Sequence, residues 1–156
     1  MQAIAMVCLG NICRSPMAEH VLRKKIQDAG LDTRVESAGT GDWHLGEAAN
    51  PKTARVLKEH GYSFEHTAKQ FQKSWFERFD LILVMDANNL HDVRALATSD
   101  EHTSKVKLLR EFDSKAETGA EVPDPYNYPI DAYYEVLEMV EAACDGVVDF
   151  LLQRKR

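Results

Sequence analysis

The sequence predicts an α/β fold, in which an open parallel four-stranded sheet carries helices on both faces. Three observations support this prediction. Apolar runs of strand length alternate with helical patterns in the order β-α-β-α-β-α-β-α, and the connections between them are short. The run of residues 81–85 contains no polar side chain, which is typical of a strand buried on both faces. In such folds, ligands lie at the carboxyl ends of the strands.

The expected elements follow from apolar spacing and from helix start and stop signals. Ser15 suits an N-cap and Pro16 the first helical position, so a helix begins soon after the first strand and ends at Gly30. Asn50 and Pro51 give the next helix the same start signal. The expected strands are residues 3–7, 34–38, 81–85 and 105–109, and the expected helices are residues 17–29, 51–60, 87–97 and 131 onward.

Composition bounds the class of protein. A chain of 156 residues, 44% hydrophobic and 28% charged, is expected to fold as a single globular domain spanning residues 1–156. No apolar run approaches the roughly 20 residues of a membrane helix, and the first residues lack a secretory signal. The net charge of −6 argues against a general nucleic-acid binder. Three cysteines do not suggest a disulfide framework, and a working thiol fits a cytoplasmic location.

The segment after the first strand combines a thiol, a loop and a helix start, in the order Cys8-Leu9-Gly10-Asn11-Ile12-Cys13-Arg14-Ser15-Pro16. Backbone N–H groups of such a loop point inward, and with the helix dipole they form a site for a phosphate-like anion. Gly10 tolerates a positive φ and Asn11 can follow it there. Arg14 can grip two oxygens of the anion, and the positive environment favours the thiolate form of Cys8.

Plainer interpretations of this segment exist. A cysteine and an arginine six residues apart arise easily by chance, and a cysteine at a strand end often belongs to the core. The succession of strand, glycine-containing loop, arginine, Ser-Pro and amphipathic helix instead favours a nucleophile at the base of an anion pocket.

A second candidate group lies far along the chain, at Asp124. Pro123 and Pro125 pin the backbone on either side of it, which suits a carboxyl group that must be aimed. The alternative is an ordinary surface turn, because Asp-Pro is a common turn dipeptide. Paired with the Cys8 loop, Asp124 is better interpreted as a general acid, since a departing phenolate is easier to expel when it is protonated.

These features together resemble the low-molecular-weight protein tyrosine phosphatases, over essentially the whole chain. The resemblance rests on the loop, the Asp124-Pro125-Tyr126 triplet, the chain length and matching stretches at residues 37–40, 43, 46, 85–86 and 88–90. It implies hydrolysis of protein phosphotyrosine and aryl phosphates through a phosphocysteine intermediate, with neither a metal nor another cofactor.

The resemblance also implies catalytic roles. Cys8 attacks phosphorus, and Arg14 holds the oxygens together with the loop N–H groups. Asp124 protonates the leaving phenolate and then deprotonates the attacking water. Ser15 supports the Cys8 thiolate, and Asn11 holds the strained loop. The implied phosphate-binding residues are Leu9, Gly10, Asn11, Ile12, Cys13, Arg14 and Ser15.

Specificity and regulation follow from the same resemblance. Family members that act on phosphoarginine carry a threonine where this chain has Ile12, so the apolar side chain favours phosphotyrosine. Trp43 and Tyr126 match aromatic residues that wall the cleft, although Trp43 alone is also compatible with a partly buried loop anchor. Cys13 matches a cysteine that can form a reversible disulfide with Cys8 on oxidation; the alternative is a small core residue.

Three other positions, His66, Asn127 and His44, bear on the resemblance. His66 matches a histidine that supports Asn11, although a lone histidine is more often a surface residue. Asn127 stands where eukaryotic relatives often carry a second aromatic residue, and His44 can also vary. These two positions leave open which peptides bind well.

Rival functions fit the residues less well. A thiol-dependent arsenate reductase needs further downstream cysteines, and only Cys144, in a helix pattern, follows Cys13. A phosphate carrier is disfavoured because Asp124 would hasten hydrolysis, and a phosphopeptide-binding module does not need the set of Cys8, Arg14 and Asp124. The expected partners are tyrosine-phosphorylated proteins or peptides, with a tyrosine kinase as a further candidate. We expect no nucleic-acid binding, no membrane insertion, and a monomer or weak dimer.

Overall fold

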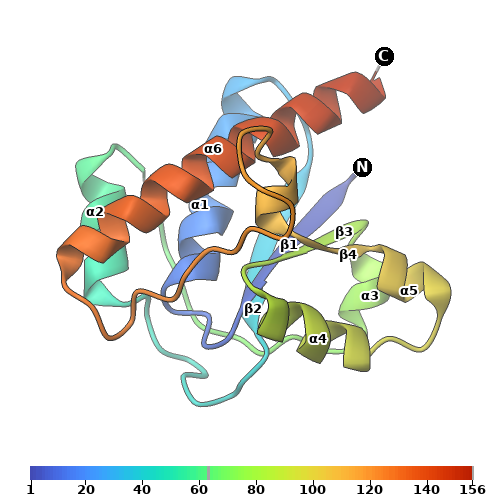
Figure 1. The fold of residues 1–156 in the computed structure, drawn as a ribbon, viewed down its shortest axis with the longest axis horizontal. Helices are drawn as coiled ribbons and strands as arrows, with labels where there is room; N and C mark the ends of the chain where they lie inside the picture. The colour runs from blue at the N-terminus through green and yellow to red at the C-terminus, as the bar shows by residue number, and fades with distance from the viewer. Residues whose placement is uncertain (63, 156) are drawn as a thin grey trace.

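A four-stranded parallel sheet carries helices on both of its faces, as the sequence predicts (Figure 1). The computed structural model describes residues 1–62 and 64–155. The strand order is β2-β1-β3-β4, and each neighbouring pair is parallel. The strands are β1 (Ala3–Cys8), β2 (Arg34–Gly39), β3 (Leu81–Val84) and β4 (Val106–Leu108), and the helices are α1 (Arg14–Asp28), α2 (Pro51–Glu59), α3 (Trp75–Arg78), α4 (Ala87–Ala95), α5 (Asp100–Ser104), the 3-10 helix η1 (Leu109–Phe112) and α6 (Ile130–Lys155).

The inner strand β1 contributes to the core on both faces of the sheet. Each of its residues is at most 2% exposed. Successive side chains of a strand point to opposite faces. The even-numbered residues of β1 therefore pack with apolar residues of α1, α2 and α6, and the odd-numbered residues pack with apolar residues of α3 and α4. This two-sided burial fixes the position of the end of β1, where Cys8 lies.

The start of α1 differs from the expectation. The helix begins at Arg14, its N-cap position is Cys13, and no side chain caps it. Ser15 lies in the first helical turn and not at the N-cap, because its hydroxyl contacts Cys8 Sγ at 2.9 Å and accepts a hydrogen bond from Asn11 Nδ2 at 2.8 Å. The serine that looks like a helix signal therefore serves the loop.

The expected pattern also omits three short elements, α3, α5 and η1, which have four, five and four residues. Segments of this length are too short to show a helical period. Two expected elements are each two residues shorter in the structure, because α4 ends at Ala95 and β4 spans Val106–Leu108, and α2 and β3 each end one residue earlier than expected. The order of the main strands and helices is nevertheless as predicted.

The topology brings distant parts of the chain together at one edge of the sheet. β1 pairs with β2 on one side and with β3 on the other, so the connections diverge at its carboxyl end, the usual ligand position in such folds. Cys8 ends β1, and Asp86 lies two residues beyond the end of β3. Within residues 1–62 and 64–155, no helix is both long and apolar enough to cross a membrane.

Candidate active site

The loop between β1 and α1 is held close against the end of β2. The carbonyl groups of Cys8 and Leu9 each accept a hydrogen bond at 2.9 Å, from the N–H groups of Thr40 and Gly41 respectively. A Cβ atom added at Gly39 would lie 2.6 Å from the Leu9 carbonyl oxygen, a distance that side chains do not tolerate. Gly39 is therefore required for this close approach, and the loop closes over the end of the sheet.

Cys8 lies at the base of this loop with its sulfur already hydrogen-bonded. The side chain is buried at 2% exposure. Its Sγ accepts a hydrogen bond from the Asn11 N–H at 3.3 Å and lies 2.9 Å from the Ser15 hydroxyl. Both contacts stabilise a negative charge on sulfur, because a hydrogen bond to an ionised group is stronger than one to a neutral group.

Asn11 holds the shape of the loop. It is fully buried and has a φ of 56°, the left-handed conformation that costs most residues roughly 1–2 kcal/mol. Its Nδ2 donates to Ser15 at 2.8 Å and to Ser37 at 2.9 Å, and its Oδ1 accepts the Lys69 N–H at 3.0 Å. The ring Nε2 of His66 lies 2.5 Å from its carbonyl oxygen. The whole polar surface of Asn11 is therefore paired.

A second layer of polar groups supports Asn11. The Ser37 hydroxyl donates to Glu19 Oε1 at 2.5 Å, and Arg23 donates to the other oxygen of Glu19 at 2.5 Å. Burial lowers the pKa of His66, although its contact with the Asn11 carbonyl opposes that shift. The loop is therefore connected through hydrogen bonds to β2 and to the middle of α1.

Arg14 is the buried cation of the site. It is 2% exposed, and its Nη1 donates to Asp86 Oδ2 at 2.7 Å and to the Val122 carbonyl at 3.0 Å. Burial lowers its pKa, but Cys8, Asp86 and Asp124 raise it more, so the pKa lies above its usual value. Asp86 is itself fixed, because it caps α4 by accepting the Asn89 N–H at 2.8 Å. Arg14 is thus charged and held in one orientation.

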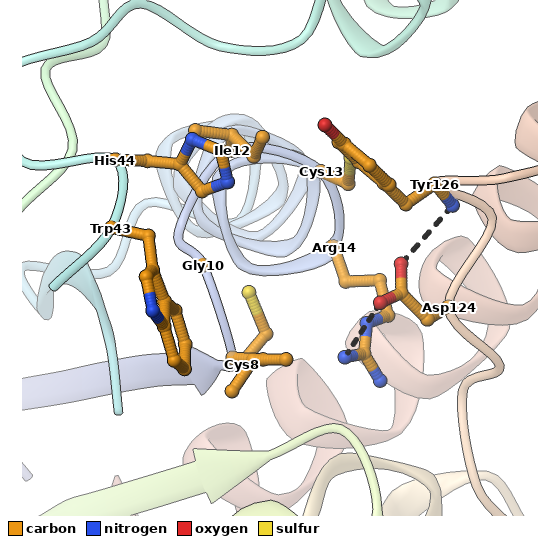
Figure 2. Close-up of a pocket in the computed structure, with 10 residues that line it drawn as sticks. Cys8, Gly10, Ile12, Cys13, Arg14, Trp43, His44, Asp124 and Tyr126 are labelled. Carbon is orange, nitrogen blue, oxygen red and sulfur yellow. Dashed lines mark hydrogen bonds and ion pairs between the residues drawn. The ribbon is translucent and has the colours of Figure 1, made fainter. Parts of the chain in front are cut away.

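Asp124 faces Arg14 across the cavity from a more exposed segment. Its side chain is 43% exposed, and its Oδ2 lies 3.7 Å from Arg14 Nη2. The other oxygen accepts the Tyr126 N–H at 3.1 Å, which gives the carboxyl group a defined direction (Figure 2). The segment is tied to the sheet by the Val122 N–H, which donates to the Met85 carbonyl at 2.7 Å.

These residues surround one cavity of about 180 Å³ (Figure 2). Trp43 and Tyr126 lie at its mouth and are 68% and 48% exposed. His44 lies between them in the lining, its Nδ1 2.9 Å from Glu47 and its ring 6.2 Å from that of Tyr126. The lining residues are Cys8, Leu9, Gly10, Ile12, Cys13, Arg14, Trp43, His44, Asp124 and Tyr126.

The cavity brings together most of the residues singled out in the sequence. Asn11, Ser15 and His66 are not in the lining but contact the loop from behind. The sequence alone assigns no supporting role to Asp86, Ser37 or Glu19, although Asp86 and Ser37 lie in stretches that match the family. Asp86 carries a signal that could have revealed it, because it follows a buried strand at the edge of the sheet where Cys8 lies. Glu19 looks like any charged residue of a helix.

The fold and this cavity define a class of α/β protein that can hold an oxyanion against a cysteine thiol, between a fixed guanidinium and a carboxyl group. The family model for low molecular weight phosphotyrosine protein phosphatases matches residues 3–156. The chain belongs to this family, and as a member it is an enzyme, a protein-tyrosine phosphatase with phosphoprotein substrates.

Two of the similar proteins carry the same activity in their names, and a third is named an arginine phosphatase. A low molecular weight protein-tyrosine-phosphatase of Streptomyces coelicolor is 51% identical over 148 residues, which are 93% of this chain and 90% of that protein. A crystal structure of a protein tyrosine phosphatase from Entamoeba histolytica, with Hepes in its active site, superposes with a TM-score of 0.93 at 32% identity and covers both chains fully (100% of each). Another similar structure is that of the YwlE arginine phosphatase of Bacillus subtilis, a cysteine-to-serine mutant with a phosphorylated active-site serine. It superposes with a TM-score of 0.86 at 27% identity, and the match covers 96% of this chain and 95% of that one.

Proposed function

We propose that this enzyme hydrolyses aryl phosphate esters of tyrosine in two steps through a phosphocysteine on Cys8. The observation that carries the proposal is the placement of Cys8 Sγ, the Arg14 guanidinium and the Asp124 carboxyl group around one small cavity. The phosphorylated active-site serine of the related arginine phosphatase supports the same covalent site.

In the first step, the Cys8 thiolate forms a bond to phosphorus and the bond from phosphorus to the tyrosine oxygen breaks. Arg14 and the loop N–H groups hold the three equatorial oxygens while charge develops on them. Asp124 gives its proton to the departing phenolate, whose ordinary pKa of about 10 makes it a poor leaving group at neutral pH.

In the second step, water attacks the phosphocysteine. Asp124, now a carboxylate, takes a proton from that water as the new oxygen–phosphorus bond forms. The sulfur–phosphorus bond breaks, and the Ser15 hydroxyl donates to the departing thiolate. Inorganic phosphate leaves, and Cys8 and Asp124 return to their starting states.

The test is hydrolysis of phosphotyrosine and of aryl phosphates by the full chain in EDTA. We expect activity to persist in EDTA and the Cys8→Ser variant to lose roughly 10⁴-fold or more in kcat, the usual scale for removal of a nucleophile. Full activity of Cys8→Ser, or loss of wild-type activity in EDTA that added metal restores, would contradict the mechanism.

Substrate preference is proposed from the cavity walls. Ile12 is apolar and nearly buried beside Cys13, and Trp43 and Tyr126 offer aromatic faces at the mouth. Such walls favour the flat ring of phosphotyrosine over the polar chain of phosphoarginine. A comparison of kcat/KM for the two phosphoamino acids in wild type and in Ile12→Thr measures this preference. A wild-type preference for phosphoarginine would overturn it.

A protective disulfide between Cys8 and Cys13 is also proposed. Peroxide oxidises the Cys8 thiolate to a sulfenic acid, and the Cys13 thiol then displaces water to form the disulfide. Burial raises the pKa of Cys13 to about 11, so its thiol stays protonated and resists direct oxidation at neutral pH. Peroxide should inactivate the enzyme and dithiothreitol should restore it. Equal recovery in Cys13→Ser would contradict the protective role.

We infer that residues 1–156 act as one domain in the cytoplasm, where the thiol stays reduced. Its partners are tyrosine-phosphorylated proteins and the kinase that phosphorylates them, and it acts as a monomer or weak dimer. Analytical ultracentrifugation of the purified protein tests the last point.

A further inference from the structure

A second cluster of reactive side chains lies apart from the catalytic cavity. Glu19 and His20 come from α1, and His66 comes from the segment between α2 and α3. One donor atom from each of the three lies within 4.8 Å of the other two. They line an open hollow that shares no lining residue with the catalytic cavity.

His20 is the unusual member of this cluster. It is 4% exposed, and within residues 1–62 and 64–155 its buried Nε2 has no hydrogen-bond partner. The carboxylate oxygen Oε2 of Glu19 lies 4.0 Å from this nitrogen. Buried polar atoms are almost always paired, so an unpaired imidazole nitrogen that faces a carboxylate calls for an explanation.

His66 is oriented as metal-binding histidines usually are. A carbonyl oxygen can only accept, so the contact with the Asn11 carbonyl places the proton on Nε2 of His66. The lone pair of the neutral ring is then on Nδ1. Histidines that bind metals commonly donate their other ring N–H to a backbone carbonyl in this manner.

We propose that Glu19, His20 and His66 form a binding site for a divalent transition-metal cation of the zinc class. Two imidazole nitrogens and one carboxylate oxygen suit zinc, whereas magnesium and calcium prefer oxygen ligands alone. The fourth position faces the open hollow, where water or the exposed carboxylate of Glu65 can fill it.

The surroundings set limits on the affinity of this site. The Arg23 guanidinium donates to Glu19 Oε2 at 2.5 Å and must withdraw when the cation enters. Its side chain is 50% exposed, so it can move into solvent. The donor atoms must also draw together, because zinc–ligand bonds of about 2.0–2.2 Å place tetrahedral ligands roughly 3.3–3.5 Å apart. Binding is therefore reversible and competes with an existing ion pair.

The site is connected to the catalytic loop by two routes. His66 contacts the Asn11 carbonyl directly, and Glu19 contacts the Asn11 amide through the Ser37 hydroxyl. When the ligands draw together, both contacts shift at the residue that holds the loop in its left-handed conformation. Occupation of the site therefore lowers kcat.

Direct binding tests the site with Zn²⁺ itself. Isothermal titration calorimetry is done in a Cys8→Ser background, which removes the catalytic thiolate as a competing ligand. We expect one Zn²⁺ per chain. His20→Gln should weaken binding by roughly a hundredfold or more, since even outer-shell changes cost 10–100-fold. His91→Gln, which removes an exposed histidine of α4, is the matched control and should bind as the background does.

The absorption spectrum of bound Co²⁺ identifies the ligand atoms. Co²⁺ bound to nitrogen and oxygen shows visible absorption without the near-ultraviolet sulfur-to-metal band that thiolate ligands produce. That spectrum, abolished by His20→Gln, is the expected result. Absence of Zn²⁺ binding, binding that His20→Gln leaves unchanged, or a sulfur-to-metal band would each overturn the site.

The effect on activity is measured separately, because it rests on the proposed function whereas binding does not. Saturating Zn²⁺ should lower kcat of the wild type more than that of His20→Gln, with His91→Gln behaving as wild type. Equal inhibition of wild type and His20→Gln would overturn the coupling to Asn11. Failure of the metal-free wild type to hydrolyse aryl phosphates would instead count against the proposed function alone.

Discussion

The two sides of the catalytic cavity are built differently. On the loop side, residues 11–15 are all buried, and Asn11 and Arg14 use their side chains in several hydrogen bonds. On the rim side, Asp124 and Tyr126 are about half exposed, and the side chain of Asp124 accepts a hydrogen bond from a backbone N–H two residues away.

This contrast separates two requirements of the chemistry. An anion pocket works only when its donors are fixed before the anion arrives, because reorganisation costs are then avoided. A general acid must reach the departing phenolate in the first step and the attacking water in the second, so it belongs on the open side of the cavity. We therefore expect substitutions on the loop side to change stability and activity together, and substitutions on the rim side to change activity alone.

Among substitutions that leave the nucleophile in place, the largest expected effect is on the rim side. Asp124→Ala should lower kcat for phosphotyrosine by roughly two to four orders of magnitude, the usual contribution of a general acid. The free energy of unfolding should change by less than about 0.5 kcal/mol, because the side chain is half exposed. Steady-state kinetics and urea unfolding measure the two quantities. A loss below tenfold would show that another group is the acid.

On the loop side, Asp86→Asn should destabilise the fold by about 3 kcal/mol. The buried Arg14 would lose the carboxylate 2.7 Å from its Nη1, and breaking a buried ion pair typically costs 3–5 kcal/mol. Asparagine is also a favoured N-cap residue, so the start of α4 is retained. The loss of stability can therefore be assigned to the contact with Arg14. Urea unfolding followed by circular dichroism provides the measurement. A loss below 1 kcal/mol would mean that the contact contributes little.

A matched pair of variants at Asn11 separates the cost of backbone strain from the loss of side-chain hydrogen bonds. Asn11→Ala and Asn11→Gly both lose the side-chain amide, but glycine adopts the φ of 56° without strain. We expect Asn11→Gly to be about 1 kcal/mol more stable than Asn11→Ala, with kcat lowered in both. Equal stability of the two variants in urea would show that the left-handed conformation relaxes when the side chain is removed.

The smallest expected effect is at the mouth of the cavity. Trp43→Ala should raise KM for phosphotyrosine by roughly three- to tenfold, since an aromatic contact contributes about 0.5–1.5 kcal/mol. The free energy of unfolding should stay within about 0.5 kcal/mol of wild type, because Trp43 is 68% exposed. If unfolding shows a loss above 1 kcal/mol, Trp43 is a structural anchor of its loop.

The same contrast explains which parts of the site could be predicted from the sequence. Cys8, Gly10 and Arg14 are close together along the chain, so the local succession of strand, loop, arginine and helix predicts an anion pocket at the end of β1. The partners of Arg14, in contrast, are 72 and 108 residues away in sequence, and no local pattern encodes such contacts.

Ser15 shows how a local rule can mislead. Ser-Pro is a common start of a helix, and the rule holds where the serine hydroxyl meets backbone N–H groups. Here the hydroxyl meets a sulfur and an amide instead, because the loop folds back over the helix start. The roles of Glu19 and Ser37 were not predicted for a related reason, since they depend on packing between α1 and β2.

The hydrogen bond from Arg14 to the Val122 carbonyl has a consequence for the synthesis of the protein in the cell. The ribosome synthesises Cys8 and Arg14 early, but the Val122 carbonyl that accepts a hydrogen bond from Arg14 follows that arginine by 108 residues. An unfinished chain that ends before Val122 therefore carries a cysteine whose arginine lacks one of its two fixed partners, and it has no general acid. Premature termination or proteolytic loss of the C-terminal part yields an inert fragment and not an unregulated phosphatase.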